Sequence, residues 1–125
     1  MSKPICFIYV EDLDFREKLR EVVLTLDINE YFLTRGDQIY QLVKNWVPFM
    51  LVVDLTGPES EWIFKHIAMI ESSVPDFPIL AIVPDNQEHA RQRAESYGCG
   101  IILTKKEFAK KIHAQIERVL RKKLQ

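Results

Sequence analysis

The stretch that decides the fold lies at residues 48–58 and reads Pro-Phe-Met-Leu-Val-Val-Asp-Leu-Thr-Gly-Pro. Its apolar run, residues 49–53, is unbroken and too short for a typical helix, which predicts a strand covered on both faces. Gly57 and Pro58 end the strand and turn the chain. Because a charge is costly in an apolar layer, we expect Asp54 to emerge at the strand's carboxyl end, where α/β sheets build their sites. On position alone, an Asp that only caps the next turn is an equal alternative.

The composition is that of one ordinary globular domain spanning residues 1–125. Hydrophobic residues make up 47% of the chain and charged residues 28%. The net charge of −1 gives no overall field that would favour nucleic acid or a membrane surface. Cys6 and Cys99 lie in apolar segments without metal-binding spacing, so we expect reduced, buried thiols in a cytoplasmic protein. We find no signal peptide and no apolar run of membrane-spanning length.

Buried strands alternate with amphipathic helices along the whole chain. Four further strands are predicted, at residues 5–10, 30–34, 79–83 and 101–103. A helix with one apolar face follows each of the five strands, the third at about residues 59–72. This pattern predicts a flavodoxin-like (βα)5 three-layer sandwich with a parallel sheet in the order 2-1-3-4-5.

Capping residues predict where several helices begin and end. Asp14, with Glu17 three residues on, resembles a capping box for the first helix. Gly36 precedes the second helix, and Asn86 is a good N-cap for the fourth. Gly98 fits the left-handed residue that ends the fourth helix. The apolar face of that helix is thin, so we expect it to pack weakly.

Charged side chains follow three strands that this topology brings to one crevice. Glu11 and Asp12 end the first strand, Asp54 ends the central one, and Lys105 follows the fifth. Three carboxylates at one place repel each other unless a cation is present, and oxygen ligands of this kind suit Mg²⁺. The lysine could pair with Asp54 or hold a phosphoryl oxygen. Asp54 is therefore a candidate phosphoryl acceptor, since carboxylates serve as nucleophiles.

Over essentially its whole length the sequence resembles the receiver domains of bacterial two-component response regulators. The segments that carry the resemblance are residues 8–12, 48–54, 77–83 and 98–105. The resemblance implies that a histidine kinase or phosphotransfer protein phosphorylates Asp54 and that Lys105 contacts the phosphoryl group. It also implies weakly bound Mg²⁺, held by Glu11, Asp12, Asp54 and the backbone carbonyl of Thr56.

Several positions depart from the family pattern. Val83 stands where the family usually has Thr or Ser, Ile102 at the matching place of a common aromatic, and Lys106 where proline is common. In the family, the hydroxyl of that Thr or Ser donates a hydrogen bond to the phosphoryl group. Valine cannot make this bond to a charged acceptor, which is worth about 1.5–3 kcal/mol. Pro84 also stiffens the following loop. Two hypotheses remain: a phosphorylated receiver with an altered relay, or a pseudo-receiver that binds a partner without phosphorylation.

Other functions fit the sequence less well. An FMN-binding flavodoxin needs a phosphate loop after the first strand, and acidic residues 11–14 would repel phosphate. No Ser–His or Cys–His set is visible, so we do not expect an enzyme.

The resemblance implies a downstream protein partner or an output domain outside this chain. In the family the fourth helix, fifth strand and fifth helix often form the output or dimer face, so a homodimer is one expectation. Direct binding to nucleic acid or membrane is not expected.

Overall fold

The computed structural model describes residues 3–57 and 60–124, in which five strands alternate with five helices. The strands are β1 (Ile5–Tyr9), β2 (Asn29–Phe32), β3 (Met50–Asp54), β4 (Ile79–Val83) and β5 (Ile101–Thr104). The helices are α1 (Leu13–Leu26), α2 (Ile39–Trp46), α3 (Glu61–Ser73), α4 (Glu88–Tyr97) and α5 (Lys105–Leu124). Within the described residues, no helix has the length and apolar character needed to cross a membrane. The predicted break at Pro58 lies outside the described residues.

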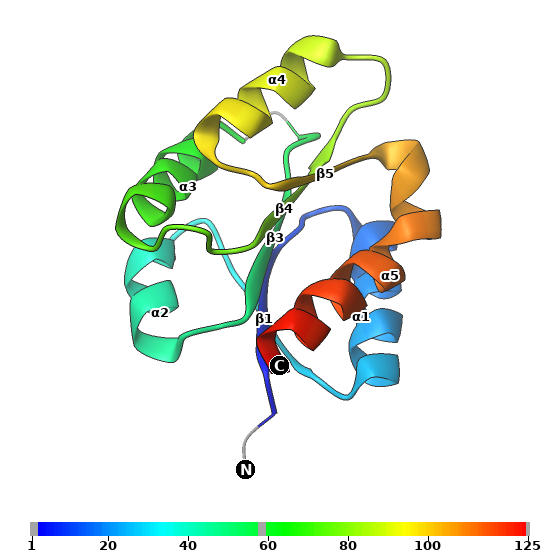
Figure 1. Cartoon of the computed structure of the whole chain (residues 1–125). Coiled ribbons are helices and arrows are strands. Elements are labelled where there is room, and N and C mark those ends of the chain that lie inside the picture. Colours follow the sequence, from blue (N-terminus) through cyan, green and yellow to red (C-terminus); the bar gives the residue numbers. More distant parts are fainter. Residues whose placement is uncertain (1–2, 58–59, 125) are drawn as a thin grey trace.

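The strands form one parallel sheet in the order β2-β1-β3-β4-β5, which confirms the predicted flavodoxin-like topology. Figure 1 shows α2, α3 and α4 on one face of the sheet and α1 and α5 on the other. The order reverses between β1 and β3, so the loops after these strands diverge, and in sheets of this kind sites form at the carboxyl ends of the strands on either side of such a point.

Side-chain alternation divides the core into two apolar layers. Met50 and Val52 of β3 join the layer under α1 and α5, and Leu51 and Val53 join the layer under α2, α3 and α4. All residues of β3 and β4 are buried, as their unbroken apolar runs predicted. This burial fixes the central strands and so fixes the position of the residue that ends β3.

Two predicted helix starts are wrong. The N-cap of α1 is Asp12, whose extended backbone lets its Oδ1 accept a hydrogen bond from the Phe15 amide at 3.0 Å. Asp14 lies in the first turn instead. The N-cap of α4 is Gln87, because Asn86 adopts a left-handed conformation with φ of 58° in the preceding turn. Both errors moved a cap by one or two residues without changing the fold.

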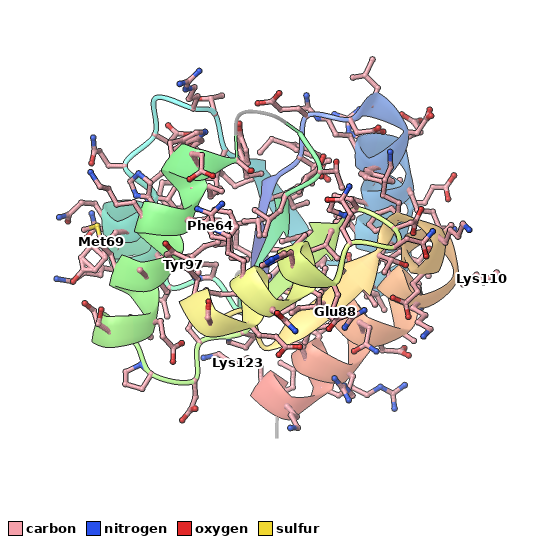
Figure 2. All side chains as sticks on the ribbon, turned by 90° about the horizontal axis from the view of Figure 1, so that it is seen from above. Phe64, Met69, Glu88, Tyr97, Lys110 and Lys123 are labelled. Atoms are coloured by element: carbon pink, nitrogen blue, oxygen red, sulfur yellow. The ribbon has the colours of Figure 1, made fainter. Side chains whose placement is uncertain are left out.

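Helix α4 buries little apolar surface, as predicted, but polar contacts hold it against α3. Ala94 is the buried residue of this helix. The guanidinium of Arg93 binds both carboxylate oxygens of Glu61 at 2.6 and 2.7 Å. The same guanidinium lies 4.1 Å from the ring centre of Phe64, which contacts Tyr97 with 4.8 Å between ring centres (Figure 2). These cation–π and aromatic contacts replace part of the missing apolar packing.

Both cysteines are buried and free, as predicted for reduced thiols. Burial raises the pKa of the Cys99 thiol to about 12, and it raises the pKa of Cys6 as well. Neither side chain is therefore a reactive thiolate at neutral pH.

Gly98 ends α4 with a φ of 113°, and we expect Gly98→Ala to lower the free energy of unfolding by about 2 kcal/mol. An alanine Cβ at this position would lie 2.9 Å from the Cβ of Glu71 and would also force a strained backbone. Urea denaturation measures the loss. Gly100→Ala is the matched control, because a Cβ there meets no atom within 4 Å. Equal losses in the two variants would contradict this account of Gly98.

Candidate functional site

Asp54 is the last residue of β3 and lies at the carboxyl end of the sheet, beside the point where the strand order reverses. The register pairs it with Ile82 of β4 and pairs the preceding Val53 with Tyr9 of β1. Among the residues that the structure describes, Asp54 is the one charged residue that is buried, with 7% of its surface exposed. A buried carboxylate is costly unless it is paired or hydrogen-bonded. Its local contacts therefore decide what it can do.

The Asp54 carboxylate is held by the residue two positions further along the chain. Its Oδ1 accepts hydrogen bonds from the amide of Thr56 at 2.9 Å and from the Thr56 hydroxyl at 2.5 Å. This local turn fixes the orientation of the carboxylate. Its Oδ2 accepts no hydrogen bond from the described residues, so one oxygen is bound and the other is left for chemistry.

Glu11 follows β1 at the same edge and is engaged by Tyr9, a residue that the sequence did not suggest. The Tyr9 hydroxyl donates a short hydrogen bond to Glu11 Oε1. Burial, with the Glu11 hydrogen bond next in importance, raises the pKa of Tyr9 to about 12, so the phenol remains a donor. The Tyr9 ring meets Trp62 edge-on, with 5.0 Å between ring centres. The site at the end of β1 is thereby joined to α3.

The side chains predicted to bind Mg²⁺ carry suitable oxygen atoms, but the structure does not arrange them around a common point. Asp12 Oδ1 caps α1, Glu11 binds Tyr9, and Asp54 binds Thr56, so each predicted ligand serves a local contact. Within residues 3–57 and 60–124, no three acidic, histidine or cysteine side chains lie in an arrangement that could hold a metal ion. The oxygen donors suit Mg²⁺ chemically, and the hydrogen bonds of Glu11 and Asp12 each use one carboxylate oxygen, but the side chains would have to move together to share one ion.

Lys105 is the first residue of α5, lies at the same edge of the sheet as Asp54, and is exposed. It makes no ion pair with any described residue, and the structure does not place its ammonium on Asp54. A lysine side chain is long and flexible and carries a compact charge. The predicted contact of Lys105 with a phosphoryl group therefore stays a prediction.

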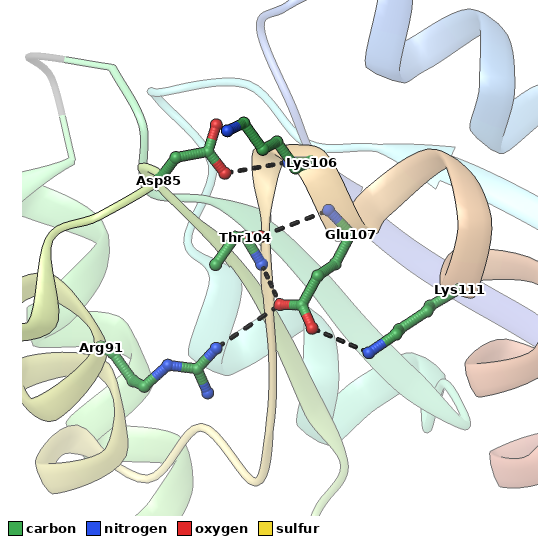
Figure 3. A network of polar contacts seen from close by, with 6 residues as sticks. All are labelled: Asp85, Arg91, Thr104, Lys106, Glu107 and Lys111. Atoms are coloured by element: carbon green, nitrogen blue, oxygen red, sulfur yellow. Dashed lines mark hydrogen bonds and ion pairs between the residues drawn. The ribbon is translucent and has the colours of Figure 1, made fainter.

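The first turn of α5 contains a capping box that the sequence analysis overlooked (Figure 3). The Thr104 amide donates to Glu107 Oε1 at 2.9 Å, and the Glu107 amide donates to the Thr104 hydroxyl at 3.2 Å. The sequence signal was the pattern Thr-Lys-Lys-Glu at residues 104–107. Glu107 also binds Arg91 of α4 at 3.5 Å and Lys111 at 2.8 Å. One carboxylate thus links the start of α5 to α4.

A second contact ties the loop after β4 to α5. Asp85 Oδ1 accepts a hydrogen bond from the backbone amide of Lys106 at 3.0 Å (Figure 3). The first amides of a helix have no partner inside the helix, and a carboxylate there is favourable. A proline at position 106 would remove this amide. The departure at Lys106 therefore creates a direct contact between the β4–α4 loop and α5.

Glu107→Gln is expected to lower the free energy of unfolding at pH 7 by about 1 kcal/mol, because it keeps the capping hydrogen bonds but removes the charge that pairs with Lys111 and Arg91. Lys111, followed by the Thr104 amide, lowers the pKa of Glu107 to about 2. Since the folded pKa is below the ordinary value of 4.5, the stabilisation is complete above that pH and disappears as the pH falls towards 2. Urea denaturation of both proteins should show the difference shrinking over that range. A constant difference from pH 7 to pH 2 would contradict the role of the charge.

Val83 and Ile102, two of the positions that depart from the family pattern, both face the apolar layer under α2, α3 and α4. Val83 is 1% exposed at the end of β4, opposite Thr104 of β5. Ile102 is partly buried and packs against the same layer. The nearest hydroxyl in the register is that of Thr104, and it is already bonded to Glu107.

Of the comparisons with known proteins, the one with solved structures supports the fold. No family model and no curated protein matches the chain. Among solved structures, it resembles the CheY-like protein TadZ from Pseudomonas aeruginosa PAO1, with a TM-score of 0.79 and 12% identity over 93% of this chain and 98% of that one. It also resembles a response regulator from Hahella chejuensis, with a TM-score of 0.78 and 15% identity over 94% and 95% of the two chains.

A third similar structure is the signal receiver domain of a modulated diguanylate cyclase from Desulfovibrio desulfuricans G20. Its TM-score is 0.70, with 21% identity over 98% of this chain and 97% of that one. Identities this low establish the fold and leave the chemistry open. The chain therefore has the CheY-like receiver fold, and the resemblance expected from the sequence is confirmed at that level.

Proposed function

We propose that the chain is a receiver domain that accepts a phosphoryl group on Asp54 and signals through contact with another protein. The observation that carries the proposal is Asp54 itself, a buried carboxylate at the carboxyl end of the central strand with one oxygen bound and one free. Folding does not require a charge at this position, since an apolar or amide side chain would be less costly there. This role assigns signalling, and not independent catalysis, to the chain.

The proposed reaction is transfer of a phosphoryl group to the free carboxylate oxygen. Asp54 Oδ2 forms a bond to phosphorus while the bond from phosphorus to the donor's leaving group breaks. The bonding electron pair stays with that group, either an imidazole of a histidine kinase or the carboxylate of a small acyl phosphate. Thr56 keeps the acceptor aligned through its two hydrogen bonds to Oδ1. Lys105 approaches a phosphoryl oxygen as a point charge.

Mg²⁺ is part of the proposal as a weakly bound ion. When bound, it would supply positive charge for the phosphoryl oxygens. Its ligands would be Glu11, Asp12, Asp54 and the carbonyl of Thr56. Because no three acidic side chains of the described residues lie in a metal-binding arrangement, part of the binding energy goes into bringing them together, and we expect low affinity.

The proposed relay uses the start of α5 in place of a hydroxyl at Val83. If Lys105 moves towards the phosphoryl group, the neighbouring amide of Lys106 and the Glu107 carboxylate move with it. These groups hold Asp85 and Arg91, so the β4–α4 loop and α4 would follow. The surface of α4, β5 and α5 is then the proposed contact face for a protein partner or a second copy of the chain.

A pseudo-receiver is the second candidate, and the dispersed acidic side chains favour it. Glu11 and Asp12 are satisfied without a metal, and the β4–α4 loop is already fixed to α5. In that case the same face binds its partner whether or not Asp54 is modified.

The deciding experiment is intact-protein mass spectrometry after incubation with acetyl phosphate, with and without Mg²⁺. We expect an added phosphoryl mass that requires Mg²⁺ and is absent in Asp54→Asn. Absence of the adduct with both acetyl phosphate and a cognate kinase, together with no Mg²⁺ binding by calorimetric titration, would instead establish the pseudo-receiver.

A further inference from the structure

A cavity of about 910 Å³ opens at the amino-terminal edge of the sheet, at the other end of the strands from Asp54. Its lining includes Phe49, which precedes β3, together with Ile79 and Ile101, the first residues of β4 and β5. The last turns of α2 and α5 form its sides. Cavities that bind small molecules commonly measure roughly 300–1,000 Å³. Nothing in the proposed phosphorylation chemistry uses this space.

The walls of the cavity are mainly apolar. They include Val47, Phe49, Val74, Phe77, Ile101 and Val119. Val74, Phe77 and Ile101 remain partly exposed, so they present apolar surface to the open space. An apolar body placed there would remove this surface from water.

The rim of the cavity carries an excess of positive charge. Its basic side chains are Lys44, Arg118, Lys122 and Lys123, and its acidic ones are Glu71 and Asp76. Among the described residues, no ion-pair partner is found for Arg118, Lys122 or Lys123, whereas Arg121, outside the cavity, pairs with Glu117 at 3.3 Å. Cations near a helix C-terminus are favourable in general, and Lys44, Lys122 and Lys123 all lie in last turns. The ends of two helices, α2 and α5, thus bring their cations to one rim.

Two residues at the cavity have an unusual backbone. Val47 ends α2 with a φ of 48° and is 66% exposed, and Asp76 has a φ of 65°. Valine is rare in the left-handed region, where glycine or asparagine normally ends a helix. Strain of this kind concentrates at functional positions. Val47 is the C-cap of α2, and its exposed side chain extends the apolar wall.

We propose that this cavity binds a small organic anion, whose apolar body contacts the walls and whose charged group lies among the rim cations. Both parts are needed, because the walls alone would accept any apolar molecule and the cations alone would bind any anion weakly. The proposal is independent of phosphorylation at Asp54, which lies at the opposite edge of the sheet.

The test uses anilinonaphthalene sulfonate, a fluorescent aromatic anion of this class, titrated against the full chain. We expect saturable binding at one site. Lys122→Gln/Lys123→Gln should weaken it by about tenfold, the loss expected when hydrogen bonds from charged donors are removed. Lys110→Gln/Arg121→Gln is the matched control, since it removes two charges from the same helix but neither residue lines the cavity. Figure 2 shows Lys110 and Lys123 far apart.

A second variant tests the apolar walls without altering charge. Gly100 lines the cavity and a Cβ there meets no atom within 4 Å, so the side chain of Gly100→Phe starts in open space and is expected to occupy the cavity. We expect it to abolish binding and leave the thermal melting temperature unchanged. The proposal is overturned if the two charge variants weaken binding equally, or if a folded Gly100→Phe protein binds as the parent does.

Discussion

Asp54→Asn is expected to abolish phosphoryl-adduct formation and, in the same protein, to raise the free energy of unfolding by about 1 kcal/mol. The carboxylate is buried, its hydrogen bonds come from the neutral donors of Thr56, and no described cation forms an ion pair with it. The asparagine oxygen can still accept both hydrogen bonds from Thr56, while the nucleophilic carboxylate is lost. Urea denaturation and intact-protein mass spectrometry measure the two effects on one sample.

Asp37→Asn is the matched control for this prediction. Asp37 Oδ2 accepts hydrogen bonds from the Thr34 amide at 2.7 Å and the Thr34 hydroxyl at 3.3 Å. One carboxylate oxygen thus again accepts from both donors of a threonine, here from a residue three positions earlier and in an exposed turn. We expect this variant to lose a little stability and to be phosphorylated normally. If Asp54→Asn were the less stable of the two, Asp54 would be a structural turn residue, the alternative that its position alone left open. An adduct that survives in Asp54→Asn would place the acceptor elsewhere.

The topology was predictable because burial on two faces leaves a strong signal in the sequence. Residues 49–53 and 79–83 are apolar at every position, a pattern typical of strands that are covered on both faces, as in the interior of a parallel sheet. Strand order then followed from the alternation of strands and helices. Consequently Asp54 was placed at the correct edge of the sheet without any structure.

Helix starts were less predictable because several residues near each start are able to cap. Asp12 and Asp14 are both good N-caps, and the backbone of the preceding loop decides between them. The choice matters for function, since a cap at Asp12 places one predicted metal ligand on the backbone of α1. The sequence showed the carboxylates, but it could not show which hydrogen bonds they make.

Contacts between distant residues were not predictable from one sequence. The pairs Asp85–Lys106 and Arg93–Glu61 join loops and helices that only the folded chain brings together. Many exposed groups could serve as partners for Asp85 and Arg93, and the sequence does not show which of them the fold brings close. The thin apolar face of α4 predicted weak packing, and these polar contacts are the reason that α4 is nonetheless held on both sides.

Val83→Thr is expected to increase the equilibrium constant of the structural change that follows phosphorylation, by about tenfold to a hundredfold. Threonine has nearly the shape of valine, so the buried position at the end of β4 can hold it. In the unmodified protein its hydroxyl has no assured partner, which we expect to lower the free energy of unfolding by about 1–2 kcal/mol. Once Asp54 carries a phosphoryl group, the hydroxyl can donate to a charged oxygen, a bond worth about 1.5–3 kcal/mol. The variant therefore destabilises the resting state and stabilises the modified one.

Amide NMR shifts of Arg91 and Lys106, recorded with and without acetyl phosphate and Mg²⁺, measure the response of the β4–α4 loop and α5. Val83→Ala is the control, because it loosens the same position without adding a donor. If phosphorylation acts on the β4–α4 loop through α5, the amide shift of Lys106 should already change in the parent protein. Val83→Thr should then add a change in the amide shift of Arg91. If Val83→Thr and Val83→Ala responded alike in a protein that is phosphorylated, the missing hydroxyl would not be what limits the switch. The contact of Asp85 with Lys106 would then be the constraint, since it fixes the loop whatever residue ends β4.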